Sequence, residues 1–441
     1  MSVLRKLVVV NTFNFSRSFS LSSSNKATHS CKLLVIGGGS GGCTMAAKFS
    51  RRLKAKDSVI VLEPSKDHYY QPLFTLVGGG VCTVRDAHRR EQDVMPKDVK
   101  WIQDYATKIN PDRSCVETKD GHVINYEYLV VATGVVMNYS KTPGLLQGLQ
   151  DPKSGVSTIY TQEYCGKTWT DIKQFKGGEA IFTFPKSVVK CPGAPQKIAY
   201  LADSYFNKTN IRSKANITYA TSAPFIFGVK KYADELDKVA KRKNIHVNLE
   251  TVLKEVRPDT REAVFYKCDK PEQTETRRYD LLHVVPNQQP PDVVFQNKEL
   301  VDSSGFLDVD MYTLQHKKFP NIYGIGDCTN TPNSKTAAAI STQSYVLERN
   351  LLATMQKDSP KQKYNGYGAC PLVTSYNTVI LAEFVYGGVP HETMTYDQSK
   401  ESVIAFYMKQ HLFPFIYWQF MLRGFYHGPG FVRNIINPLG W

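Results

Sequence analysis

Two of the nine cysteines stand directly before a proline, Cys191 in VVKCPGAPQK (188–197) and Cys370 in GYGACPLVT (366–374). The Cys-Pro step favours an extended backbone that could present each sulfur outward. A pair of thiols stores two electrons, and it can exchange with a sulfur nucleophile. Because 179 positions separate the two cysteines (370 − 191), spacing alone cannot pair them, and the partner of Cys191 stays open among the other eight.

A glycine-rich turn near the start of the chain predicts a dinucleotide site. CKLLVIGGGSGGCTMAAKFSRRL (31–53) is an apolar strand, then Gly37, Gly39 and Gly42 at the spacing G-x-G-x-x-G, then a helix-forming run. Glycines allow the tight turn and a close approach of backbone to a pyrophosphate, with Gly41 in the same loop. Glu63 ends the next apolar strand, 21 positions after Gly42 (63 − 42), where a carboxylate can bind ribose hydroxyls.

Two later strand ends favour FAD over NAD. YEYLVVATG (126–134) ends in Ala-Thr-Gly at Gly134, and FPNIYGIGDCTN (319–330) contains Gly-Asp at Asp327. Both resemble motifs of flavoproteins with two dinucleotide-binding domains, in which the Gly-Asp carboxylate binds the ribityl or phosphate part of FAD. A helix start follows, where N–H groups would stabilise negative charge on a reduced flavin. Its residues are Lys335, Thr336, Ala337 and Ala338, with Lys335 either adding positive charge or facing solvent.

The second strand–turn–helix pattern lacks the phosphate-binding glycines. EAIFTFP (179–185) is a buried strand, and its turn carries Cys191, two prolines and a single glycine, Gly193. Side chains in this turn would keep a pyrophosphate away from the backbone. We therefore expect that NAD(P)H is not the electron donor.

These patterns predict an α/β chain with two Rossmann-like domains and a C-terminal amphipathic membrane-interface segment. The expected FAD-binding domain combines 31–150 with 281–370, and 151–280 forms the second domain, which lacks an NAD(P) motif. A C-terminal region, 371–441, is expected to associate with membrane and quinone.

Several segments resemble the mitochondrial sulfide:quinone oxidoreductases from residue 31 to the C-terminus. They are VKCPGAPQK, CPLVTSYNTVILAEF, HYYQPLFTLVGGG, DVMPKDVKW and LRGFYHGPGF. The resemblance implies that Cys191 and Cys370 are the redox cysteines, bridged in the resting enzyme near the flavin. It also implies that Glu63 binds the adenosine ribose, that Gln71 contacts FAD, and that Ala106 offers a backbone contact near the adenine. Many bacterial members carry a third cysteine near the Ala-Thr-Gly strand, and VVMNYSKTPGL has none here.

For the reaction, the resemblance implies hydrogen sulfide as electron donor and ubiquinone as acceptor. Sulfide would form a persulfide on a cysteine, and glutathione or another small nucleophile would carry off the sulfane sulfur. One alternative is a type II NADH:quinone oxidoreductase, which the missing second glycine loop disfavours. The other is a non-catalytic flavoprotein with a binding or signalling role, which the two Cys-Pro sites disfavour.

The two ends of the chain suggest a mitochondrial membrane. The first 30 residues hold four basic side chains, many serines and no acid, which is typical of a transit peptide. The segment 402–441 has no acidic residue, and its longest uncharged run, 410–422, has 13 residues, too few to cross a bilayer. Aromatic side chains beside Lys409, Arg423 and Arg433 favour helices lying in the membrane interface, and an aromatic homodimer contact or a core helix is the alternative. The expected location is the mitochondrial inner membrane, on its surface.

The composition adds two exclusions. The net charge of +15 could suit nucleic acid, but no motif supports such a partner. No CxxC pair occurs among the cysteines, so the spacing of zinc ligands is absent and no metal is predicted.

Overall fold

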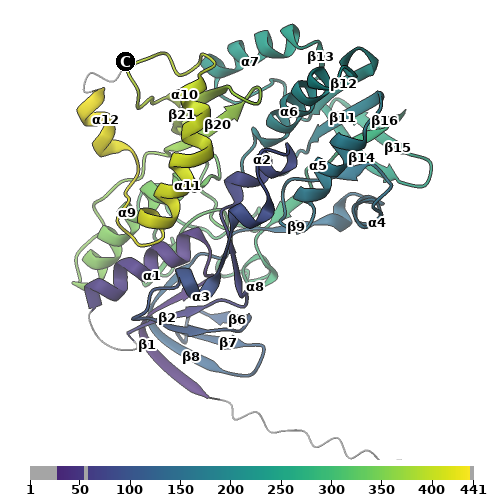
Figure 1. Cartoon of the computed structure of the whole chain (residues 1–441). Coiled ribbons are helices and arrows are strands. Elements are labelled where there is room, and N and C mark those ends of the chain that lie inside the picture. Colours follow the sequence, from purple (N-terminus) through teal and green to yellow (C-terminus); the bar gives the residue numbers. More distant parts are fainter. Residues whose placement is uncertain (1–26, 54–57, 438–441) are drawn as a thin grey trace, which may run out of the picture.

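The computed structural model describes residues 27–53 and 58–437. A first sheet of seven strands lies beside α1, and Figure 1 labels β1, β2, β6, β7 and β8 of it. β19 also belongs to this sheet and pairs with β8. The seven strands are β1 (Thr28–Ile36), β2 (Val59–Leu62), β5 (Lys100–Ile102), β6 (Ala106–Asn110), β7 (Cys115–Thr118), β8 (Val123–Val131) and β19 (Ile322–Gly324). The strands β1, β2, β5, β8 and β19 pair in parallel, and β2 and the end of β1 are buried throughout, as expected for strands covered on both faces. The helices α1 (Ser40–Leu53) and α9 (Ala337–Met355) pack on each other at this sheet.

A second, parallel sheet has the order β10-β17-β11-β12-β13. Its strands are β10 (Val156–Ser157), β11 (Gly178–Phe184), β12 (Ala215–Thr221), β13 (Ile245–Asn248) and β17 (Leu281–His283). Its helices are α5 (Cys165–Gln174), α6 (Ala194–Lys208) and α7 (Lys230–Arg242), and an antiparallel side sheet holds β14 (Thr251–Arg257), β15 (Glu262–Lys267) and β16 (Lys270–Arg278). The expected boundary at residue 281 is displaced, because β17 pairs with β10 and β11 and so belongs to the second sheet.

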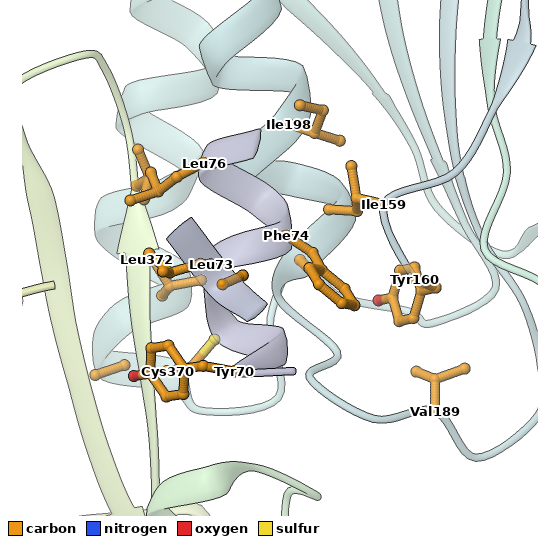
Figure 2. Close-up of a cluster of buried hydrophobic side chains, with 14 of the residues drawn as sticks. Tyr70, Leu73, Phe74, Leu76, Ile159, Tyr160, Val189, Ile198, Cys370 and Leu372 are labelled. Atoms are coloured by element: carbon orange, nitrogen blue, oxygen red, sulfur yellow. The ribbon is translucent and has the colours of Figure 1, made fainter. Parts of the chain in front are cut away.

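Short elements connect the two sheets. They are β3 (Asp67–Tyr69), α2 (Phe74–Gly78), β4 (His88–Arg90), α3 (Glu91–Val94), β9 (Val136–Asn138), α4 (Leu145–Gln150), β18 (Asn287–Gln289) and α8 (Asp292–Phe295). Figure 2 shows Phe74 and Leu76 of α2 among the buried side chains that include Ile198 of α6 and Leu372 of β20 (Gly368–Val373). This apolar cluster joins the segment after β3 to the helix that follows Cys191, so it fixes the two halves of the site relative to each other.

The C-terminal part forms a sheet and a helical column. The sheet holds β20, β21 (Val379–Val385) and β22 (Val389–Pro390). The column contains α10 (Val403–Tyr407), a π-helical turn over Met408–Leu412, α11 (Phe413–Ile416) and a second π-helical turn over Tyr417–Met421 (Figure 1). Pro414 lies inside this column and has no N–H to donate, so a regular α-helical ladder is interrupted there. A last helix, α12 (Gly430–Ile436), follows. Among the described residues, no helix is long and apolar enough to cross a membrane.

Two of the basic residues expected at a membrane interface are buried instead. Lys409 and Arg433 are 4% and 8% exposed, and only Arg423 of the three is exposed. The Lys409 Nζ donates to the carbonyl of Pro72 at 3.1 Å. Arg433 donates to three oxygens of the segment 391–393. Two of the three basic side chains of the tail therefore make contacts inside the protein rather than at a membrane surface.

The predicted transit peptide (1–30) lies mostly outside the described residues, which begin at 27. Its last three residues, 28–30, belong to β1 and pair with 123–125 of β8. Those three residues are therefore part of the folded sheet.

Candidate active site

A cavity of about 520 Å³ lies between the glycine-rich turn, the Cys191 turn and the C-terminal column. Most of the predicted site residues line it: Gly37, Gly39, Gly41, Glu63, Gln71, Gly134, Cys191, Asp327, Lys335, Thr336, Ala337 and Ala338. Three predicted residues do not. Gly42 packs behind the turn, Cys370 is fully buried behind Cys191, and Ala106 packs against the core of the first sheet at the start of β6.

The glycine-rich turn is shaped for a phosphate group. A Cβ on Gly42 would lie 1.7 Å from the carbonyl oxygen of Gly37, so only glycine allows α1 to start this close to β1. A Cβ on Gly39 would meet no atom within 4 Å, which leaves its backbone open to the cavity. Glu63 accepts hydrogen bonds from the N–H of Gly38 at 2.6 Å and of Ser65 at 2.7 Å, which fixes the carboxylate at the cavity wall. The residues present therefore fit a dinucleotide cofactor.

The opposite end of the cavity is positively charged. The Lys335 side chain is buried and donates to the carbonyl of Thr329 at 2.7 Å, so it does not face solvent. α9 begins at Ala337, and its N-cap is Thr336, whose Oγ1 accepts from the N–H of Ala339. Burial raises the pKa of Asp327, and the charges of Lys335 and Lys190 oppose that shift.

The structure brings the two Cys-Pro cysteines together. Their Sγ atoms lie 3.8 Å apart, and both are free thiols, so the bridge implied by the resemblance is not formed in this structure. Cys370 lies in β20, while the N–H of Cys191 donates to the carbonyl of Lys335 at 2.9 Å. Cys191 has φ 49°, a left-handed conformation that is uncommon for residues other than glycine and that occurs at functional sites.

The single glycine of the second turn has a specific role. A Cβ on Gly193 would lie 2.8 Å from the Cys370 Sγ and 2.6 Å from Leu372. Both distances are shorter than real Cβ contacts, so a side chain here would displace the thiol. Gly193 therefore leaves space for the sulfur of Cys370, whereas Gly42 leaves space for the backbone carbonyl of Gly37.

The thiol of Cys370 and a buried lysine together shift the pKa of Cys191. The Nζ of Lys197, in the first turn of α6, donates to the Cys191 Sγ at 3.2 Å. A hydrogen bond from the Cys370 thiol lowers the pKa of Cys191 well below its usual value; burial opposes this, and the Lys197 charge adds to it. The same hydrogen bond, together with burial, raises the pKa of Cys370. In the reduced pair, Cys191 is therefore the thiolate and Cys370 the thiol.

Sequence reasoning placed Lys409 at the membrane interface and gave no role to Lys190 or Lys197. In the fold, Lys190, Lys197 and Lys409 all line the cavity. Burial, and then the charge of Lys197, lower the pKa of Lys409 to about 8. Burial also lowers the pKa of Lys190 to about 8, and its Nζ donates to the Gln71 side chain at 2.6 Å. The sequence offered no signal for Lys409, which lies 218 positions beyond Cys191 (409 − 191).

The C-terminal column is attached along one face of α1, the helix that follows the glycine-rich turn. The side chains on α1 are spaced by four, four and three positions, which places them on the same face. The contacts are Ser40 Oγ to Tyr417 OH at 2.8 Å, Thr44 Oγ1 to the Met421 carbonyl at 3.1 Å, Lys48 Nζ to His427 Nδ1 at 2.9 Å, and Arg51 Nη1 to the Arg423 carbonyl at 2.9 Å. The tail and the cofactor helix therefore form one packed unit (Figure 1).

A buried polar cluster supports this contact. The Tyr417 hydroxyl also lies 2.6 Å from His68 Nε2, and His68 Nδ1 lies 3.0 Å from Glu91. Cys43 donates to Glu91 at 3.3 Å, and Cys43, His68 and Glu91 form the one set of three metal-type side chains among the described residues. Their mutual hydrogen bonds account for their grouping, and burial with the Glu91 charge raises the pKa of Cys43, so its thiol stays protonated.

Comparison with known proteins agrees with this geometry. A family model described as pyridine nucleotide-disulphide oxidoreductase matches residues 31–178. The mitochondrial sulfide:quinone oxidoreductase of Mus musculus is 48% identical over 92% of this chain and 89% of its own length. The chain belongs to the sulfide:quinone oxidoreductase family. The mitochondrial sulfide:quinone oxidoreductase of Dictyostelium discoideum is 42% identical over 92% of this chain and 89% of its own length.

A solved structure shows the same fold. The sulfide:quinone oxidoreductase of Aquifex aeolicus superposes with a TM-score of 0.76, at 19% identity, over 93% of this chain and 96% of the other. Members of this family are flavin-dependent oxidoreductases, and the cavity described above is where such a cofactor fits.

Proposed function

We propose that this protein is an FAD-dependent sulfide:quinone oxidoreductase. The observation that carries the proposal is the position of Cys191: its Sγ lies 3.8 Å from that of Cys370, and Cys191 lines the same cavity as the glycine-rich turn. A two-electron thiol pair therefore borders a dinucleotide site, while the second turn lacks the glycines that NAD(P)H needs.

FAD would lie with its pyrophosphate at Gly37–Gly42, its ribose at Glu63 and its ring near Lys335 and Cys191. When bound, FAD supplies two-electron redox chemistry between the thiol pair and quinone. The chain's own groups position it: the N-terminus of α9 and the buried Lys335 place positive charge where reduction adds negative charge.

The chain's own chemistry begins with the oxidised, bridged cysteine pair. Hydrosulfide attacks the Sγ of Cys370, the Cys191–Cys370 bond breaks, and Cys370 becomes a persulfide. Cys191 leaves as a thiolate, and Lys197 stabilises that charge at 3.2 Å. An acceptor thiolate, such as that of glutathione, then attacks the outer sulfur, the S–S bond of the persulfide breaks, and Cys370 leaves and takes up a proton to become a thiol. Closing the bridge again releases two electrons, which pass to quinone by way of the cofactor.

We infer that the C-terminal column faces the lipid of the mitochondrial inner membrane, where ubiquinone dissolves. Eleven of the twenty large hydrophobic side chains exposed in the described residues lie between 403 and 436, including Ile404, Phe415 and Phe431. Exposed apolar groups on this scale mark an interaction surface. The relatives at 48% and 42% identity carry mitochondrial in their names, which supports a mitochondrial location.

The deciding experiment is an anaerobic titration of the flavin-loaded protein with sulfide, and separately with NADH, followed by flavin absorbance. We expect sulfide alone to bleach the flavin, and Cys191→Ser and Cys370→Ser each to abolish the bleaching while flavin content stays normal. Bleaching by NADH alone would overturn the proposal. A liposome sedimentation assay with Ile404→Glu and Phe431→Glu tests the membrane surface, with Phe225→Glu as a matched exposed aromatic outside the tail.

A further inference from the structure

A second hollow, of about 240 Å³, lies in the domain that has no dinucleotide motif. Its wall contains the carboxyl ends of two parallel strands: the last two residues of β11 with Pro185 and Lys186 after it, and Val284 with Val285 after β17. The side sheet closes it with Val252–Lys254 of β14 and Tyr266 of β15. It is separate from the flavin cavity, because the two share no lining residue.

This hollow lies where open parallel sheets commonly bind their ligands, at the carboxyl ends of two neighbouring strands. β11 leads through α6 to β12 on one side, whereas β17 returns to the other side of β11. The two strands are parallel, but the chain leaves them toward opposite edges of the sheet, so the strand order reverses between β11 and β17. The crevice at the carboxyl ends of two such strands is where open α/β sheets bind ligands. Phe182 pairs with His283, the last residue of β17, so β11 runs two residues further, to Phe184, and the carboxyl ends of both strands border the hollow.

The charge of the hollow selects anions. Three lysines line it, Lys141, Lys186 and Lys254, and no aspartate or glutamate does. All three are exposed, and none forms an ion pair with a carboxylate of the described residues. Three unpaired ammonium groups around one concave surface attract a ligand that carries more than one negative charge.

The hollow is coupled to the reactive turn through the backbone. The loop that begins at Pro185 and Lys186 reaches Cys191 within five further residues. Asn287 lines the hollow, and its neighbour Gln288 accepts from the N–H of Lys190 at 2.9 Å. A ligand held by Lys186 would therefore contact the segment that carries the redox thiolate.

We propose that this hollow binds a small organic polyanion, one that carries two or more carboxylate or phosphate groups. Two sources share that chemistry. One is an anionic thiol that accepts the sulfane sulfur, an assignment that rests on the proposed function. The other is a nucleotide phosphate, bound without the glycine-rich turn.

The test is binding of two unreactive probes to the flavin-loaded, full-length protein, measured by titration calorimetry at low and at physiological salt. S-methylglutathione represents the thiol acceptor, and adenosine diphosphate represents a nucleotide. We expect at least one probe to bind with a Kd of about 1 mM or tighter. Each of Lys141→Gln, Lys186→Gln and Lys254→Gln should weaken that binding about two- to fivefold, the size typical of exposed ion pairs.

The matched control removes the same charge elsewhere. Each of Lys173→Gln, Lys208→Gln and Lys270→Gln, at exposed lysines outside both cavities, should bind the probe like the wild type. Binding of S-methylglutathione that only the hollow variants weaken identifies the acceptor, and a higher KM for glutathione at unchanged kcat should accompany it. Binding of adenosine diphosphate alone identifies a nucleotide site.

The inference is overturned if neither probe binds, or if the hollow variants and the control variants behave alike. This outcome is distinguishable from failure of the proposed function. Bleaching of the flavin by sulfide needs none of these three lysines, so it is measured in the same variants as an independent readout.

Discussion

The two strand–turn–helix units of this molecule, β1–α1 and β11–α6, share one architecture and serve different chemistry. In the first, Gly42 lets the helix start against the carbonyl of Gly37, and bare backbone faces the cavity. In the second, Gly193 lets the Sγ of Cys370 approach the turn, and Cys191 faces the cavity. The comparison teaches that a glycine in such a turn is required by the group that packs against it. That group is the backbone of the phosphate-binding turn at Gly42 and the sulfur of Cys370 at Gly193.

The largest effect is expected from Gly42→Ala. Its Cβ would lie 1.7 Å from the Gly37 carbonyl oxygen, so α1 must move away from β1 and the phosphate cradle is lost. We expect the purified protein to retain about a tenth or less of the flavin of the wild type, as measured by visible absorbance per chain. Gly166→Ala on α5, where a Cβ meets no atom within 4 Å, should keep its flavin. Full flavin in Gly42→Ala would show that this turn does not hold the cofactor.

Gly193→Ala should separate the two units. The added Cβ displaces the Cys370 thiol but touches nothing in the phosphate cradle, so flavin content should stay normal. The rate of flavin bleaching by sulfide should fall about 10- to 100-fold, because a misplacement of about 1 Å is costly in a reaction between positioned groups. Stopped-flow absorbance measures the rate. An unchanged rate would show that Gly193 is not required to position the Cys370 thiol.

Lys197→Met tests the positive charge that lies beside Cys191 in the second unit. The wild-type hydrogen bond from Cys370 and the Lys197 charge lower the pKa of Cys191, so removing the lysine must raise that pKa. Alkylation of the reduced protein by iodoacetamide near neutral pH should slow about tenfold and recover as the pH increases. Lys173→Met, an exposed lysine of α5, should leave the pH profile in place. A profile of Lys197→Met that does not move would assign the low pKa to the thiol pair alone.

The smallest effect is expected from Tyr417→Phe, which connects the tail to the first unit. The change removes the hydroxyl that lies 2.8 Å from Ser40 and 2.6 Å from His68, and it leaves buried polar groups without a partner. Flavin should dissociate about three- to tenfold more readily in a fluorescence-release assay. Tyr407→Phe alters an exposed hydroxyl on α10 and should change nothing. Equal release in both variants would show that the tail and the cofactor turn are independent.

Much of the first unit could be predicted from sequence, because its signals are local. Each of its motifs can be recognised within a short stretch of sequence. These motifs are the strand, the glycine spacing, the carboxylate of Glu63 and the N-terminus of α9. The second unit could be predicted only in part. Its Cys-Pro steps are visible, but the burial of Lys197 and the proximity of Cys370 depend on α2 packing against α6 and β20 (Figure 2).

The C-terminal tail was even harder to predict from sequence than the second unit. Its aromatic, acid-free composition predicted helices in a membrane interface with Lys409 and Arg433 beside them, yet both of these basic side chains are buried in the fold. Composition cannot distinguish a basic side chain at a lipid surface from one that donates to a carbonyl inside the fold. That choice depends on which carbonyls the rest of the chain leaves nearby, and those belong to Pro72 and to the segment 391–393.

The sequence by itself determined the two Rossmann-like units, the missing second glycine loop and the two candidate cysteines, since each is a pattern within a short stretch of chain. Only the tertiary structure decided that Cys191 and Cys370 meet, that Cys191 is the thiolate, and that Lys190, Lys197 and Lys409 join Lys335 around the cavity. The physical reason is that contact across 179 positions and the burial of a charge are properties of packing, whereas strand, turn and helix signals depend on neighbouring residues.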